Sequence, residues 1–326
     1  MSSFAEQQLA ALNVQGLKSL IAGFDAACRQ HSDRPAFTAM GATISFAELD
    51  AQSAYLARFL LEELGLTAGD RVAIQLPNIN QYPVAAWAVL RAGLVIVNTN
   101  PLYTERELVH QFSDSGSKVM IGLQSMLGAT ARVIDKTPVE HVISVGVPPG
   151  DEEQALFSGL SVGLVDFTAA LKGGAGMSCE LNSGSMQDLA VLQYTGGTTG
   201  VPKGAMLTQG NLFAGMCQSL EKYPNKYPQG ELLLAPMPLY HIYGFTAHCI
   251  SGVLNGRLSV LIPNPRDVDS IIDAWKAHRV TSLCGINTLF AAMLAHPEFS
   301  KLDFSTLQAV IAGGTTLVEE LAVAWE

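Results

Sequence analysis

The feature that most constrains the fold is an alternation of short apolar runs with segments of helical periodicity. Residues 72–76 and 94–97 are apolar runs of strand length, separated by a helical segment with Pro83 in its first turn. Two strands joined by such a crossover pair in parallel. Further runs of strand length follow, at 118–121, 189–194, 232–235, 258–262, 281–283 and 309–311. The pattern predicts an α/β fold with largely parallel sheets and helices on both faces.

Four segments carry signals for the start of a helix. In a capping box, a hydroxyl residue is followed three positions later by a glutamate, and the pair satisfies free N–H groups of the first turn. The predicted caps are Ser45, Thr104, Thr208 and Thr316, with Glu48, Glu107 and Glu319 completing three of the boxes. Gly65 ends the helix that starts after Ser45. Residues 146–185 are rich in Gly, Ser and Pro and predict a long, partly mobile connection.

A glycine- and threonine-rich stretch, residues 194–204, follows one predicted strand and reads Tyr-Thr-Gly-Gly-Thr-Thr-Gly-Val-Pro-Lys-Gly. Glycines let backbone N–H groups approach a ligand, threonine hydroxyls bind phosphate oxygens or Mg²⁺, and Lys203 supplies a cation. The spacing excludes a Walker A loop, because Lys203 stands between Pro202 and Gly204. The stretch predicts a polyphosphate site, and the alternative is an ordinary surface loop.

This stretch resembles the phosphate loop of the adenylate-forming superfamily, which comprises acyl-CoA synthetases, luciferases and the adenylation domains of peptide synthetases. Residues 100–104, 238–242, 287–290 and 302–304 are similar to segments of bacterial long-chain fatty acyl-CoA synthetases. The resemblance extends from about Phe37 to the last residue. It implies that ATP, with Mg²⁺, activates a long-chain fatty acid to an acyl-adenylate, and that the acyl group then passes to coenzyme A.

The resemblance also implies the domain organisation, an N-terminal domain of two facing α/β lobes. The first lobe would cover 71–229 and end with the phosphate loop, and the second would combine 25–70 with 230–326. Residues 1–24 would form a helical extension. The family's C-terminal lid domain, with its catalytic lysine, lies beyond these 326 residues, so we expect the chain alone to be inactive.

Individual roles follow from the resemblance. The catalytic residues would be Thr198, which is also the Mg²⁺ ligand, Lys203, and His241 beside the acyl carboxylate and the adenylate phosphate. The residues around ATP would be Tyr194, Thr195, Gly196, Gly197, Thr198, Thr199, Gly200, Lys203, Gly204, Gly313, Gly314 and Thr315. The acyl group would contact Tyr240, Tyr243, Phe245, Asn287 and Leu289. Phe245 fits the gate of the acyl tunnel best and Tyr243 second, and residues 285–290 would form its end wall.

Alternatives remain open at several of these positions. From the residues alone, His241 could be a core histidine, and the Gly313–Gly314 pair an ordinary turn between a strand and a helix. The chain also departs from the family at Gln209, where the family usually has a histidine. For the whole protein, the alternatives are a ligase for an aryl or amino acid and a non-catalytic module that binds a nucleotide or lipid.

Composition narrows the partners and the location. A formal net charge of -10 argues against nucleic-acid binding, which needs a basic face. Five widely spaced cysteines without a Cys-x-x-Cys pair indicate reduced thiols in the cytoplasm. Arg91 and Arg257 interrupt the most apolar windows, which fall short of the roughly 20 residues that span a membrane. Peripheral contact with the inner face of the cell membrane and a homodimer both stay open.

Overall fold

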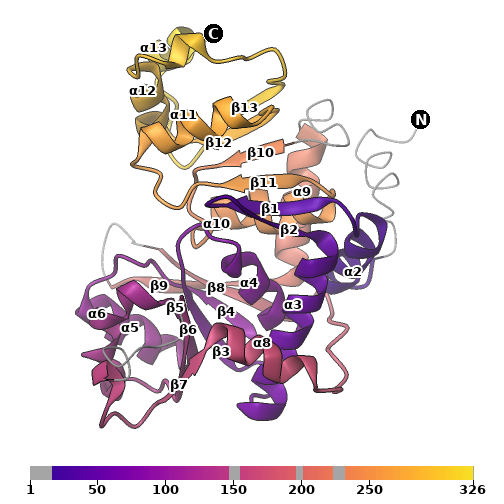
Figure 1. Ribbon diagram of the computed structural model, residues 1–326, viewed down its shortest axis with the longest axis vertical. Helices are drawn as coiled ribbons and strands as arrows, with labels where there is room; N and C mark the ends of the chain where they lie inside the picture. Colours follow the sequence, from indigo (N-terminus) through magenta and orange to yellow (C-terminus); the bar gives the residue numbers. More distant parts are fainter. Residues whose placement is uncertain (1–16, 147–154, 196–200, 223–231, 326) are drawn as a thin grey trace.

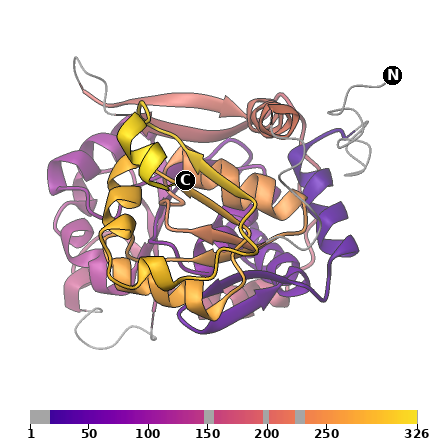
Figure 2. The same ribbon diagram turned by 90° about the horizontal axis from the view of Figure 1, so that it is seen from above.

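Two β-sheets, with helices packed on their faces, lie one above the other (Figure 1). The computed structural model describes residues 17–146, 155–195, 201–222 and 232–325. Within these ranges one sheet has 7 strands and the other has 6. Seen from above, the six-stranded sheet with helices α11(Val268–Ala277), α12(Asn287–Leu294) and α13(Glu319–Trp325) covers part of the lower sheet (Figure 2). The arrangement confirms the predicted α/β class.

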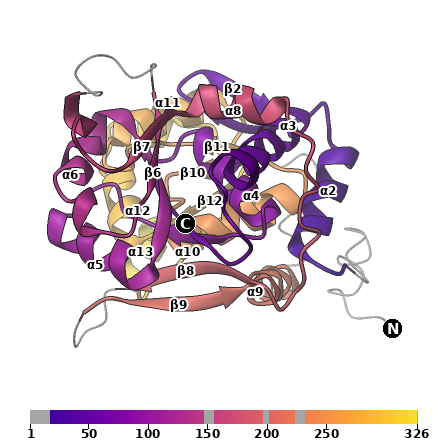
Figure 3. The ribbon, with the colours of Figure 1, turned by 90° about the horizontal axis from the view of Figure 1, so that it is seen from below.

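The seven-stranded sheet has the order β7-β6-β5-β3-β4-β8-β9, and all of its neighbours are parallel except β8 and β9. Its strands are β3(Arg71–Gln75), β4(Val95–Asn98), β5(Ser117–Leu123), β6(His141–Val145), β7(Gly163–Asp166), β8(Leu189–Thr195) and β9(Lys203–Thr208). The hairpin of β8 and β9 runs along one edge of the molecule beside α9(Gln209–Lys222) (Figure 3).

The six-stranded sheet, of order β13-β12-β10-β11-β1-β2, takes strands from both ends of the described chain. These are β1(Pro35–Ala39), β2(Ala42–Ser45), β10(Leu232–Ala235), β11(Leu258–Leu261), β12(Ser282–Gly285) and β13(Ala309–Ala312). All of its pairs are parallel except the hairpin of β1 and β2. That hairpin turns through Met40 and Gly41, whose φ angles are 50 and 79°, as a two-residue turn of this kind requires.

The core between the sheets is built around α4(Gln81–Arg91), of which every residue after Gln81 is buried. A helix that is apolar all round needs partners on every side. The ring of Trp87 stacks on Phe24 at 4.2 Å, and its Nε1–H donates to the Cys249 carbonyl at 3.2 Å. Helix α4 therefore joins the upper and lower sheets.

Successive residues of β3 face different cores. Val72 and Ile74 pack in the core that contains α4, whereas Ala73 packs with Phe112 of α5(Glu105–Ser115) on the other face. Side chains that alternate in this way between two cores are typical of a strand that is covered on both faces. The remaining helical elements are α2(Leu20–Gln30), α3(Phe46–Arg58), η1(Phe59–Glu63), η2(Gln124–Met126), α6(Leu127–Ala131), η3(Ile134–Lys136), α8(Phe167–Ala175), α10(Ile242–Gly244), η4(Phe245–Gly252) and η5(Phe299–Lys301).

The capping predictions are confirmed at three of the four positions. Ser45 and Thr104 form complete capping boxes with Glu48 and Glu107. The Asn211 N–H donates to Thr208 Oγ1 at 3.1 Å at the start of α9. The Thr316 prediction is wrong, because α13 begins only at Glu319.

Two segments predicted as loops contain regular structure. The supposed connection over 146–185 contains the parallel strand β7 and the helix α8, which Asp166 caps through its Oδ1. Gly174 of this helix packs so closely on the Tyr55 carbonyl that a Cβ would collide with it, so its glycines serve helix packing. Lys203 and Gly204, predicted at the exit of the phosphate loop, begin strand β9 instead.

Candidate active site

A cavity of about 800 Å³ lies where the carboxyl ends of strands from both sheets meet. Ligands of α/β proteins bind at this end of the strands, and the volume is in the range of small-molecule sites. The residues that line it follow β3, β4 and β5 of the lower sheet and β10, β11 and β12 of the upper one. They include Pro77, Asn78, Pro101, Leu102, Met126, Met237, Tyr240, Pro263, Arg266, Ile286 and Leu289.

Asn78 fixes the segment that follows β10. The side chain is buried, and its Nδ2 donates to the carbonyls of Ala235 and Met237 at 3.0 and 2.9 Å. Its Oδ1 accepts from the Leu239 N–H at 2.8 Å. Because Asn78 follows β3 of the other sheet, these three bonds hold the carboxyl ends of the two sheets together.

A second chain of buried polar side chains reaches the same segment. The Tyr82 hydroxyl donates to Asn98 Oδ1 at 2.5 Å, and Asn98 Nδ2 donates to Gln193 Oε1 at 3.0 Å. Gln193 Nε2 in turn donates to the Tyr240 carbonyl at 3.3 Å. Residues 235–240 are thus held from two directions immediately before His241.

His241 caps the short helix α10, and its Nδ1 accepts from the Tyr243 N–H at 3.2 Å. With Nδ1 as the acceptor, the neutral ring carries its proton on Nε2. The residue is exposed, but desolvation by its neighbours still lowers the pKa of the imidazole below its usual value. His241 therefore offers a neutral N–H donor, and it lies in the chain between Tyr240 of the large cavity and Tyr243.

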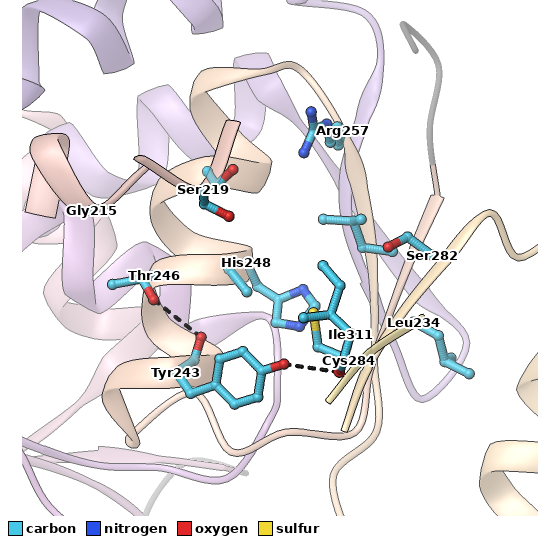
Figure 4. A pocket seen from close by; sticks show the side chains of 13 residues that line it. Gly215, Ser219, Leu234, Tyr243, Thr246, His248, Arg257, Ser282, Cys284 and Ile311 are labelled. Atoms are coloured by element: carbon cyan, nitrogen blue, oxygen red, sulfur yellow. Dashed lines mark hydrogen bonds between the residues drawn. The ribbon is translucent and has the colours of Figure 1, made fainter. Parts of the chain in front are cut away.

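Tyr243 borders a second, smaller cavity of about 190 Å³ (Figure 4). This small cavity lies among η4, α9 and the strands β10, β12 and β13. The Tyr243 hydroxyl donates to the Ile311 carbonyl at 3.0 Å, and Ile311 lines the cavity too. Phe245, the first choice for the gate, is instead fully buried in the core between the sheets.

The turn after β13 contains the predicted Gly313, Gly314 and Thr315. Gly314 has a φ of +79°, a left-handed conformation that favours glycine, and a Cβ on Gly313 would lie 3.0 Å from the Tyr243 ring. Asn287 Nδ2 donates to Thr315 Oγ1 at 3.3 Å and to the Thr316 carbonyl at 2.8 Å. Asn287 therefore holds this turn, while the predicted substrate residues Tyr240 and Leu289 line the large cavity.

The glycine-rich loop connects β8 to β9. Thr195 and Lys203 are paired across this hairpin, and both are exposed. The predicted site residues Gly196, Gly197, Thr198, Thr199 and Gly200 lie outside the described residues. Since Thr198 is the predicted Mg²⁺ ligand, the predicted metal site also lies outside the described residues. In the part of the chain that the structure describes, no group of three or more His, Cys, Asp or Glu residues could hold a metal ion.

Tyr194 of β8, predicted to contact ATP, is buried where the hairpin packs on α5. Its hydroxyl donates to Asp114 Oδ2 at 2.6 Å, and burial together with this carboxylate raises the pKa of the phenol. The Tyr194 ring leaves little room for a side chain at position 204, because a Cβ on Gly204 would lie only 3.0 Å from it. From the same helix as Asp114, His110 Nε2 lies 2.8 Å from the Pro202 carbonyl at the end of the loop.

Sequence reasoning missed several residues that support these positions, namely Asn78, Tyr82, Asn98, His110, Asp114 and Gln193. Signals for two of them were present. Asn78 and Asn98 stand at or just after the carboxyl ends of predicted strands, where a polar side chain meets the ligand edge of a sheet.

The model of the AMP-binding enzyme family matches residues 24–326. The chain belongs to the AMP-binding enzyme family. It is 39% identical over 334 residues to a long-chain-fatty-acid–CoA ligase of Salmonella typhimurium, an alignment that covers 97% of this chain and 59% of that protein. The resemblance to the adenylate-forming superfamily is thereby confirmed.

Solved structures show the same fold. A long-chain-fatty-acid–CoA ligase from Archaeoglobus fulgidus has a TM-score of 0.80 at 21% identity, covering 95% of this chain and 60% of its own. An anthranilate CoA ligase bound to anthranoyl-AMP has a TM-score of 0.84 at 19% identity. The match covers 96% of this chain and 58% of that protein. In the sequence comparison above, the chain spans about 59% of the length of the Salmonella ligase. No helix among the described residues is long and apolar enough to cross a membrane.

Proposed function

We propose that the whole protein is a long-chain-fatty-acid–CoA ligase that forms an acyl-adenylate from ATP and then an acyl-CoA thioester. Family membership and the similarity to such ligases support this proposal. The single observation that carries it is the position of residues 240–243. Tyr240 lines the large cavity, Tyr243 borders the small one, and His241 stands between these two tyrosines in the chain.

His241 would act where two anions meet. The fatty-acid carboxylate attacks the α-phosphorus of ATP, so a donor at this point offsets the repulsion between them. The Nε2–H of a neutral imidazole can donate to either the carboxylate or the adenylate phosphate. Asn78 and Gln193 would act as positioning residues, because they hold the segment that ends at His241.

ATP would be held by three parts of the chain. Thr195 and Lys203 at the mouth of the hairpin, together with residues 196–200, would hold the phosphates. The turn of Gly313, Gly314 and Thr315 would hold the adenine, since the backbone of a glycine allows a close approach. Mg²⁺, for which Thr198 is the proposed ligand, neutralises phosphate charge when it is bound.

The acyl chain would enter the small cavity past Tyr243. Of the two aromatic residues expected at the gate, Tyr243 borders this cavity and Phe245 does not. We therefore propose Tyr243 as the gate. Its phenol would release the Ile311 carbonyl when the chain enters.

An aryl carboxylate is the second candidate substrate. The volume of about 190 Å³ supports it, since a cavity of about 150 Å³ already holds benzene. A long chain would have to widen the small cavity. Pyrophosphate release by the whole protein, measured with saturated acids of increasing length and with benzoates, tests the proposal. Activity only with aryl acids would contradict it.

The cytoplasmic location, peripheral contact with the inner face of the membrane and a homodimer are also proposals. A fatty substrate that partitions into lipid supports membrane contact. Sedimentation with vesicles of anionic phospholipid tests that contact, and sedimentation equilibrium tests the dimer.

A further inference from the structure

The small cavity contains buried polar atoms that the described part of the chain leaves without partners. His248 is 1% exposed, and its Nδ1 lies 3.2 Å from Ser259 Oγ, but its Nε2 has no hydrogen-bond partner there. Ser282, also 1% exposed, has an unpartnered Oγ. Both residues line the cavity, and Figure 4 shows the His248 ring pointing from η4 toward Cys284 and Ile311. Buried polar groups without partners are rare in folded proteins.

The His248 ring can pair with a hydroxyl in either tautomer. Burial lowers the pKa of His248 to about 4, so the ring is neutral at pH 7. If Nδ1 donates to Ser259, Nε2 is a free acceptor, and if Nδ1 accepts, Nε2 is a free donor. A hydroxyl group both donates and accepts, so it satisfies Nε2 in each case. Ser282 Oγ has the same dual capacity.

The surface of the cavity is more apolar than polar: Leu233, Leu234, Ala247 and Ile311 contribute apolar surface, and Ser219, Thr246, Ser251 and Arg257 contribute polar groups. An occupant that fits this surface is mainly hydrocarbon and carries one polar group beside His248 and Ser282. We propose that His248 and Ser282 form a subsite for a hydroxyl group on the acyl chain, so that the protein prefers hydroxylated fatty acids. This inference rests on the proposed function, because it places the acyl chain in the small cavity.

The test uses the whole protein with hexadecanoic acid and a series of its monohydroxy isomers, in which the hydroxyl occupies different positions along the chain. The readouts are kcat/KM for pyrophosphate release and the Kd for acid binding without ATP. We expect one isomer or a few adjacent ones to exceed hexadecanoic acid by about tenfold, which corresponds to one good hydrogen bond. The variant H248L should abolish this preference.

The variant H248Q is the matched control, because its amide keeps a donor and an acceptor near the position of Nε2 and should retain the preference. If H248L fails to fold, S282A replaces it, since loss of one hydroxyl is a small change. We expect S282A to reduce the preference by about threefold.

Three outcomes would overturn the inference. Hexadecanoic acid could be activated with no isomer preferred, as expected if a water molecule satisfies His248 and Ser282. The preference could also persist unchanged in both H248L and S282A. In these two cases the proposed function stands. If no long-chain acid is activated at all, the proposed function fails and this inference fails with it.

Discussion

The two cavities differ in the structure that forms them. The large cavity is lined by loops that follow six strands of two sheets, and prolines recur along it, among them Pro77, Pro101, Pro238 and Pro263. The small cavity is lined by side chains from strands and helices, including the fully buried His248 and Ser282. Loops fixed at the strand ends suit binding of a polar cosubstrate, whereas a wall of packed side chains suits selection among acyl chains. We therefore expect substitutions around the small cavity to change substrate preference, and substitutions at the segment joining the cavities to change rate.

The largest effects are expected for Phe245 and Tyr243, the two candidates for the gate, and they should appear in different quantities. Phe245→Ala should lower the free energy of unfolding by about 3–5 kcal/mol and leave the acyl profile intact, because the ring is fully buried in the core. Tyr243→Ala should change the acyl profile at a smaller cost in stability, since this residue is half-buried. Urea denaturation and an acyl-length panel measure the two quantities.

Tyr243→Phe is the control for this comparison, because it keeps the ring and removes the hydroxyl that donates to the Ile311 carbonyl. A Phe245→Ala variant with unchanged stability and an altered acyl profile would instead assign the gate to Phe245.

The next effect concerns His241, which stands in the chain between Tyr240 of the large cavity and Tyr243 of the small one. His241→Ala should lower kcat for adenylate formation by about 10²–10³, the usual loss when one preorganised donor is removed. His241→Gln should recover part of the rate because its amide can donate. ATP–pyrophosphate exchange measures both variants. Wild-type exchange by His241→Ala would assign this histidine a structural role.

A smaller effect is expected for Asn78, which holds the segment that precedes His241. Asn78→Ala leaves two carbonyls and one N–H without their partner, and should lower the free energy of unfolding by about 1–3 kcal/mol and also lower kcat. Asn80→Ala is the matched control, because Asn80 Nδ2 makes a single bond within the described residues, to the Ala42 carbonyl at 2.9 Å. Equal kcat values in the two variants would mean that Asn78 does not position the site.

A separate effect is the dependence of stability on pH that the buried imidazole of His248 confers. The unfolded chain binds a proton at His248 below its ordinary pKa of 6.5, whereas the folded chain binds it only below about 4. Stability should therefore fall as the pH drops from about 6.5 toward 4, because the unfolded chain takes up a proton at His248 that the folded chain does not. Urea denaturation at pH 7 and pH 5 should show a smaller loss for His248→Gln than for the wild type. Equal losses would contradict a buried neutral His248.

The sequence predicted the strands and helices that have strong periodicity or clear caps, such as β3, α4 and the helices after Ser45, Thr104 and Thr208. It failed where tertiary packing decides the structure. Helix α8 was missed because Gly173 and Gly174 weaken its helical pattern, yet Gly174 is what lets it approach Tyr55. Thr316 has the capping-box spacing, but its carbonyl is bound by Asn287 from another element.

The candidate site could be predicted only in part, for the same reason. Motifs located the glycine-rich stretch of residues 194–204, His241 and the turn at Gly313 and Gly314, because each is a local pattern in the chain. The partners of these motifs could not be predicted, since Asn78 and Ala235 are 157 positions apart and meet only after both sheets form. Gln209, the departure from the family pattern, is buried and accepts the Leu20 N–H at 3.0 Å, a tie to α2 that local sequence does not indicate.

The most direct test of the account is a crystal structure of the whole protein with a hexadecanoyl sulfamoyl adenosine, a stable analogue of the acyl-adenylate. We expect the alkyl chain to lie in the small cavity past Tyr243, near His248, with the sulfamoyl group within hydrogen-bonding distance of His241 Nε2. An alkyl chain lying in the large cavity against Tyr240 and Leu289, with the small cavity closed by Tyr243, would contradict it.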